Sequence, residues 1–405
     1  MDGKDHGVDI DRQLCESGAV STPMPTIRPD AVDHYMALLA DNTLPCEALC
    51  LTAVWGVAIP DAVLRYDGFP GSRQGALVAT DEQVSIRSAS LPVVFVDDCD
   101  GWTFLLEDNG YHGTDPQVLT ALSRDSLAVS VYWNVNRLSR INYAQAGRLL
   151  ATFDFVIRQQ PYGEDPDRIR PYLSGLAFTD QARILAEGVA LVEHVTGVRL
   201  TRDWLERPHP ASVVVARTEF EPSPIDGWLA RLAPELAAAA SGATRPALRV
   251  AAAAVVADLY RATSVTDPDR LGALSADPDR MNPDERTEVR DYLLTTARQA
   301  YRLSLELQWD RSLAASAANR IPRLRAEYRR RPTAAAQAAR ERAELARAYA
   351  VGAAFARLHE DPLLSLTNVL ANAYRVDRDQ FPASSDRATE VLRMGSAGTS
   401  KTAIV

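Results

Sequence analysis

The chain has 405 residues, which is enough for two or three domains that each bury a core of their own. Its hydrophobic content of 46%, net charge of −9 and pI near 5.3 are typical of a soluble globular protein and argue against general nucleic-acid binding. No apolar run approaches the ~18 residues that a membrane helix needs, so we expect no membrane span.

The N-terminal residues 1–28 are polar and have no periodicity, which predicts a disordered segment. They lack the apolar core of a secretory signal, and we expect a cytoplasmic protein with reduced thiols. A helix is predicted from Pro29, with Val32, Tyr35, Met36 and Leu39 on one face.

Two further helices are predicted, one over residues 45–57 and one from Pro60 to Gly68, followed by a short strand over residues 76–79. The first of these would place Cys46 and Cys50 on one helical face. No second cysteine pair or nearby histidine completes a metal-ligand set, so we interpret both as small buried residues.

Residues 91–155 hold most of the strand-like sequence. Apolar runs at residues 92–96 and 102–106 flank Asp100-Gly101, a strong hairpin signal. A turn follows at Asn109-Gly110, and Asp115 is placed to cap a helix that runs through Arg124.

Three more strands are predicted over residues 127–134, 138–144 and 148–155, the last two joined by a turn at Ala146-Gly147. The short connections favour a mostly antiparallel sheet with flanking helices, an α+β domain over residues 29–215. We expect one set of side chains to point inward (Trp102, Phe104, Val129, Val131 and Trp133) and another to face the opposite side (Thr103, Ser130 and Tyr132).

Helices at Asp165 and at residues 179–195 complete this domain. Gly197 is placed to stop the second helix, and Thr201 to cap one more turn.

Four segments carry a resemblance to a known family: CLTAVWGVAIPDAVLR, GWTFLLEDNGYHG, AVSVYWNVNRLSRINYAQAG and ALVEHVTGVRLTRDWL. Through them, residues 51–205 resemble an uncharacterised actinobacterial family designated only as a domain of unknown function. The resemblance implies an actinobacterial source and supplies no catalytic residues.

The second half of the chain is Ala-rich and helical in pattern. We expect a linker over residues 216–224, a helical bundle over residues 225–378 and a disordered tail over residues 379–405. The predicted helices cover residues 225–240, 246–261, 283–319, 333–359 and 362–374. Asn282 is a cap with Glu285 three residues on, and the helix after it should bury Val289, Leu293, Ala297, Ala300, Leu303 and Leu307.

Polar side chains follow two strands of the predicted sheet. One group comprises Glu107, Asp108, Asn109 and His112, and the other Asn134, Asn136, Arg137 and Arg140. If adjacent strand ends bring them together, Glu107, His112 and Arg140 are candidates for acid–base catalysis, and Asn109, Asn134, Asn136 and Arg137 for ligand binding. The alternative interpretation is that Asp-Asn-Gly forms a turn and the asparagines satisfy backbone groups.

Two charged segments bear on metal and nucleic-acid binding. Asp97, Asp98 and Asp100 could hold a divalent cation, but acidic residues are common at hairpin tips, and we predict neither a metal site nor a cofactor. The one basic run, residues 320–331, could contact phosphates or an acidic partner, but a solvated helix end is the simpler interpretation.

No phosphate-binding loop, dinucleotide fingerprint, zinc-protease motif or nucleophile elbow is present. We therefore expect a non-enzymatic interaction or regulatory protein, whose α+β domain recognises a partner or small ligand and whose helical half docks or forms a homo-oligomer. The alternative is a hydrolase-type enzyme that uses Glu107, His112, Asn134 and Arg140.

Overall fold

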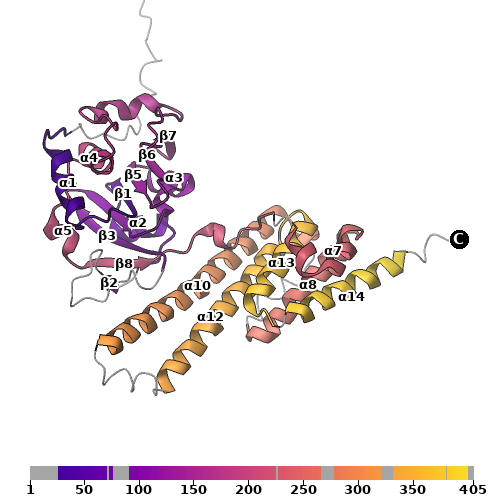
Figure 1. The fold of residues 1–405 in the computed structure, drawn as a ribbon. Helices are drawn as coiled ribbons and strands as arrows, with labels where there is room; N and C mark the ends of the chain where they lie inside the picture. The colour runs from indigo at the N-terminus through magenta and orange to yellow at the C-terminus, as the bar shows by residue number, and fades with distance from the viewer. Residues whose placement is uncertain are drawn as a thin grey trace, which may run out of the picture. The chain divides into compact units, whose positions relative to one another are not determined.

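A computed structural model describes residues 26–70, 73–75, 91–224, 227–265, 278–320, 332–379 and 381–399. The chain divides into two compact units, one within residues 1–85 and 93–212 and the other within residues 86–92 and 213–405 (Figure 1). In the described ranges, no helix has the length and apolar character needed to cross a bilayer.

The first unit is built on an eight-stranded sheet. Every pairing with a defined register is antiparallel, which confirms the predicted α+β class. Across the sheet the order is β2 (Arg73–Gly75), β8 (His209–Val213), β3 (Val93–Cys99), β4 (Trp102–Glu107), β1 (Leu49–Trp55), β5 (Leu127–Trp133), β6 (Ser139–Gln145) and β7 (Arg148–Phe153).

The prediction of a helix over residues 45–57 is wrong, because Leu49–Trp55 forms the central strand β1 between β4 and β5. A strand buried on both faces has a continuous apolar run instead of an alternating pattern, so its period does not distinguish it from a buried helix. Cys50 is buried in this strand while Cys46 is exposed before it, so the two do not share a helical face.

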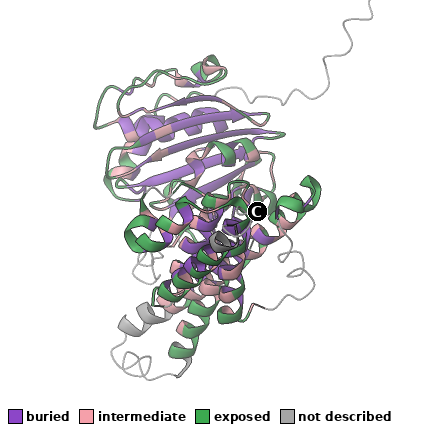
Figure 2. Cartoon of the chain, turned by 90° about the vertical axis from the view of Figure 1, so that its right-hand side faces the viewer, coloured by how far each residue is buried: buried purple, intermediate pink, exposed green. Residues whose placement is uncertain are grey.

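Helices cover both faces of the sheet, and Figure 2 shows its strands as buried along most of their length. The predicted inward set does share one face, on which α4 (Ile184–Thr196) packs closely enough that a Cβ on Gly188 would lie 2.9 Å from Val131 Cγ2. The predicted opposite set is covered as well: Thr103 and Ser130 are buried, although the sequence alternation suggested a single buried face.

Short helices lie over this second face. They are α2 (Ile59–Arg65), the 3₁₀ helix η2 (His112–Thr114) and α3 (Pro116–Leu122). On the first face, α1 (Ala31–Ala40) packs against α4, and η3 (Pro166–Leu173) and α5 (Arg202–Glu206) complete the unit.

The turn and cap signals are placed as predicted. Asp100, Asn109, Ala146 and Gly197 all have positive φ, which is the left-handed conformation that these turns and the α4 C-cap require. Asp115 accepts from Gln117 N at 2.8 Å, and Thr201 accepts from Trp204 N. However, α4 begins at Ile184, later than the predicted Thr179.

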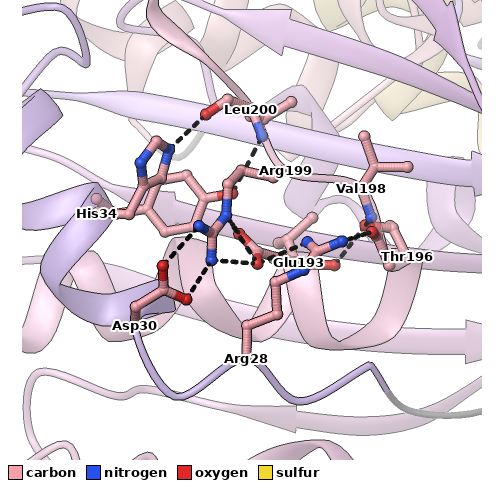
Figure 3. A network of polar contacts seen from close by, with 11 residues as sticks. Arg28, Asp30, His34, Glu193, Thr196, Val198, Arg199 and Leu200 are labelled. Carbon is pink, nitrogen blue, oxygen red and sulfur yellow. Dashed lines mark hydrogen bonds and ion pairs between the residues drawn. The ribbon is translucent and has the colours of Figure 1, made fainter.

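The described residues begin at residue 26, within the segment predicted to be disordered. Arg28 donates to Glu193 Oε1 at 2.9 Å, and Arg199 bridges Glu193 and Asp30, so the first residues of the domain are tied to the end of α4 (Figure 3). The rest of the predicted disordered segment, residues 1–25, lies outside the described residues, as do the predicted strand over residues 76–79 and residues 321–331 of the basic run.

The second unit is helical, as predicted. Its elements are α6 (Trp228–Leu232), α7 (Pro234–Ser241), α8 (Arg245–Thr263), η5 (Pro278–Arg280), α10 (Pro283–Arg320), α12 (Pro332–Arg357), α13 (Pro362–Val376) and α14 (Phe381–Thr399). The single helix predicted over residues 225–240 is instead two, because the chain leaves helical geometry at Ala233, before Pro234.

The prediction of a disordered tail over residues 379–405 is also wrong for most of that range, since residues 381–399 form α14. Its polar composition conceals an apolar stripe: Phe381, Ala388 and Leu392 are buried, and the helix packs on α8 and α7. Along α10 the Asn282 cap is confirmed, with Oδ1 accepting from Glu285 N at 2.8 Å.

The buried stripe of α10 is partly as predicted. Leu293, Ala297 and Ala300 are buried, but Val289, Leu303 and Leu307 are only half-buried. Leu305 and Trp309 are buried instead, so in the C-terminal part of α10 the buried face differs from the predicted one.

The predicted linker is fixed to the helical unit. Val215 O accepts from Arg298 Nε at 2.9 Å, and the short helix η4 (Arg217–Glu219) leads to Phe220, which is buried against Tyr301 and Tyr349. Further along, the amide of Asn368 accepts from Ser223 N at 3.2 Å and donates to Ser223 O at 3.0 Å. The prolines of residues 216–224 predicted a linker, and the structure adds these contacts to the helical unit.

Candidate functional site

Glu107, the last residue of β4, lies in the interior of the first unit. Its partner across the sheet is Cys50 of β1, so its side chain points to the face covered by α2 and η2. Oε1 accepts from the hydroxyl of Tyr66 at 2.5 Å and from Gly113 N at 3.0 Å. A buried carboxylate needs such donors because it has lost its hydration.

Gly113 brings the η2 backbone close enough to make this bond. A Cβ at this position would lie 2.5 Å from the hydroxyl of Tyr66 and 2.8 Å from Cys50 Sγ, and would also clash with Thr52. Only glycine allows this close approach of the chain to the sheet. The carboxylate is thus held by one side chain from the end of α2 and one backbone group of η2.

His112 lies at the edge of the same cluster. Its Nε2 is 3.4 Å from Asp67 Oδ2, and its ring packs edge-on against Tyr66 at a centroid distance of 5.3 Å. Asp67 adopts a positive φ after the C-terminus of α2, which turns its carboxylate toward the histidine. Tyr66 therefore contacts both Glu107 and His112, two residues that the sequence analysis had grouped.

The electrostatics of the cluster keep its hydroxyl and thiol protonated. Burial, followed by the negative charge of Glu107, raises the pKa of Tyr66 well above its usual value. The same two causes raise the pKa of the Cys50 thiol. Tyr66 therefore acts as a hydrogen-bond donor to Glu107, and Cys50 is not a thiolate nucleophile in this state.

Arg140 does not reach this cluster. The strand register places Arg140, Tyr132, Cys50 and Glu107 in one row across β6, β5, β1 and β4. Three strand spacings of ~4.8 Å put Arg140 about 14 Å from Glu107 at the backbone. Its guanidinium instead donates to the hydroxyl of Tyr162 at 2.8 Å.

The predicted amide ligands shape turns. Asn134 Oδ1 accepts from Asn136 N at 3.0 Å and from Leu138 N at 3.1 Å, and its amide nitrogen donates to the hydroxyl of Tyr132. Arg137 and Asn109 both have positive φ on exposed turns. The polar residues thus form two groups, the Glu107–Tyr66–His112 cluster and the β5–β6 turn.

The acidic hairpin is partly neutralised. Asp97 Oδ2 lies 3.1 Å from His209 Nδ1 and also pairs with Arg207. Within the described ranges, no group of three or more His, Cys, Asp or Glu side chains is arranged to hold a metal ion.

Sequence reasoning missed Tyr66, Gly113 and Asp67. Tyr66 and Asp67 follow a short helix, and Gly113 stands in a loop, so no local pattern distinguishes them. They contribute because α2 and η2 lie over the same strands, which is a long-range relationship.

Exposed apolar side chains gather where β5, β6 and β7 begin or end. Val135 and Leu138 lie on the β5–β6 turn, Ile157 follows β7, and Tyr162 returns to pair with Thr152 of β7. Their exposed fractions are 67%, 58%, 71% and 44% in that order. We call Val135, Leu138, Ile157 and Tyr162 the strand-end patch.

Residues 46–219 match a family of unknown function (DUF6461). The match agrees with the resemblance to a domain of unknown function inferred from the quoted segments, and it runs from just before β1 to η4. Neither the comparison with curated proteins nor that with solved structures yields a match.

Proposed function

We propose that this protein is a non-enzymatic interaction or regulatory protein of the cytoplasm, in which the α+β unit recognises a partner and the helical unit docks or oligomerises. The observation that carries the proposal is the strand-end patch, which exposes four large apolar side chains at one end of the sheet. Exposed apolar side chains that gather in one region of a surface are typical of interaction sites. We also propose an actinobacterial source, which the sequence resemblance implies.

The state of the predicted catalytic residues also supports an interaction role. Glu107 is only 4% exposed, and its Oε1 is engaged by Tyr66 and Gly113. A general base must reach its substrate, and this carboxylate instead holds η2 against the sheet. Asn134 is likewise used to form a turn.

The second candidate is the hydrolase-type enzyme. It is favoured by the Tyr66–Glu107 hydrogen bond of 2.5 Å with His112 beside it, because paired titratable groups of this kind recur in active sites. Such an enzyme would have to act without Arg140, which lies three strands away.

Complementation of a host strain that lacks the protein separates the two functions. We expect Glu107→Gln to retain activity, and a chain cut after Val215 to lose it while leaving a folded sheet, since β8 ends at Val213. Leu138→Asp should lose activity without unfolding, whereas Leu64→Asp, at a similarly exposed position on α2 outside the patch, should retain activity. Full loss from Glu107→Gln in a folded chain would overturn the interaction proposal in favour of the enzyme.

A further inference from the structure

We propose that the strand-end patch binds a protein segment that presents apolar side chains flanked by carboxylates. This inference rests on the proposed interaction function and adds the chemistry of the partner. Its evidence is the arrangement of arginines around the patch.

Three arginines accompany the apolar side chains. Arg137 precedes Leu138 on the turn, Arg158 follows Ile157, and Arg140 hydrogen-bonds the hydroxyl of Tyr162. A hydrogen bond joins the Asp154 carboxylate to Ser139, and Asp154 Oδ1 also accepts from Ile157 N at 3.1 Å, so the β6 and β7 sides of the patch are adjacent. Arg137 and Arg140 therefore stand beside Leu138 and Tyr162, and Arg158 stands beside Ile157.

These guanidinium groups are not neutralised. Among the residues that the structure describes, none of the three pairs with a carboxylate; Arg140 donates to Tyr162, and Arg158 donates to Thr179 O at 2.5 Å. A guanidinium carries five N–H donors, so each retains donors for a bidentate carboxylate partner.

Other arginines of the same unit are used differently. Arg183 pairs with Asp33 at 3.0 Å, Arg202 pairs with Asp41, and Arg207 pairs with Asp97. Acidic residues outnumber basic ones in this unit, and most of its described arginines pair with a carboxylate, so the three arginines beside the exposed apolar side chains differ from the majority.

Two nearby acids make bonds to groups other than these three arginines. Asp154 Oδ1 accepts from Val156 N at 3.0 Å in addition to its bonds to Ser139 and Ile157, and Glu164 pairs with Arg148 at 3.3 Å. An incoming carboxylate would therefore meet guanidinium groups whose own carboxylate neighbours are already occupied.

The side chains around the arginines distinguish a peptide from a nucleic acid. Single-stranded nucleic acids bind to aromatic platforms on which bases stack. Three of the four patch residues are aliphatic or β-branched, which suits the apolar side chains of a protein segment. Opposite charge at the rim would then guide orientation and association.

The test uses the full chain and a phage-displayed library of random peptides about twelve residues long, followed by fluorescence anisotropy with the selected peptides. We expect them to combine Leu, Phe or Trp with Asp or Glu, and to bind more weakly as salt is raised. Arg137→Glu with Arg140→Glu should weaken binding at least tenfold, and so should Leu138→Asp. The matched controls Arg124→Glu and Val250→Asp, both exposed and outside the patch, should leave affinity unchanged.

Several results would overturn the inference. Selected peptides that lack acidic residues, or that bind equally to the patch variants, would do so. Loss of binding from Leu138→Asp but not from the arginine variants would reject the acidic partner while leaving the proposed interaction function in place. A wild-type dimer that Leu138→Asp converts to a monomer in light scattering would instead make the patch an interface between copies of this chain.

Discussion

The ring of Phe220 occupies the space that a side chain on Gly352 would need, since a Cβ on this α12 glycine would lie 2.5 Å from Phe220 Cδ1. Phe220 is 2% exposed and contacts Tyr301 and Tyr349, so the segment after β8 is attached to the helical unit at this point. Glycine at this position in the helix therefore allows the ring of Phe220 to pack closely against α12.

Gly352→Ala should destabilise the helical unit, although alanine normally stabilises a helix interior by about 1 kcal/mol relative to glycine. We expect a loss of about 1–3 kcal/mol because the added methyl meets the ring. In the Phe220→Ala background the same substitution should cost less, since the clash is gone. Chemical denaturation of the four chains of this cycle measures it, and additive effects would contradict the contact.

Gly113→Ala should disrupt the buried cluster, because its methyl group would collide with Tyr66 and Cys50. We expect a loss of several kcal/mol, as for an overpacked core. Gly175→Ala is a control for glycine replacement at an uncrowded site, since nothing lies within 4 Å of its Cβ position, although its φ of +79° adds backbone strain. Equal melting temperatures for the two variants would contradict the proposed close approach.

Tyr66→Phe should leave the buried Glu107 carboxylate without its 2.5 Å donor. Removing one partner of a buried charged group costs about 1–3 kcal/mol, and adding Glu107→Gln should recover part of that loss, because an amide is less costly to bury than a carboxylate. Urea denaturation at neutral pH provides the comparison. A double variant less stable than Tyr66→Phe would show that the charge of Glu107 is not what makes the site sensitive.

Arg199 should be the most sensitive position of the network in Figure 3. Burial by itself would raise the pKa of Glu193, but hydrogen bonds from Arg199, Arg28 and Tyr35 outweigh it and lower the pKa. Arg199→Met should therefore cost about 3–5 kcal/mol by leaving a buried carboxylate short of cationic partners. Asp30→Asn removes only the exposed ion pair with Arg199 and should have a small effect on the melting temperature.

His209 should make the stability of the sheet depend on pH. Burial lowers its pKa below the ordinary 6.5, although Asp97 at 3.1 Å opposes this shift. The unfolded chain then binds the proton more readily than the folded chain, so the contribution of neutral His209 is fully present above pH 6.5 and is lost as the pH falls through the lower folded-state value. Denaturation midpoints across this range should fall more steeply for the wild type than for His209→Asn. Parallel pH profiles would contradict the assignment.

Local patterns determined much of the fold. The hairpin at Asp100-Gly101, the caps at Asp115 and Asn282, and the stop at Gly197 are decided by the conformational needs of a few neighbouring residues, and the structure has them where the sequence placed them. Alternation along residues 127–133 likewise identified a strand with Val131 and Trp133 on one face.

Only the tertiary structure decided the elements whose burial comes from distant parts of the chain. Leu49–Trp55 is a strand because β4 and β5 flank it, and residues 381–399 form a helix because α7 and α8 cover their apolar stripe. The candidate site divides in the same way: Glu107 and His112 are close along the chain, but Tyr66 joins them and Arg140 is held apart by strand order. Such placements depend on long-range packing, which residue spacing does not encode.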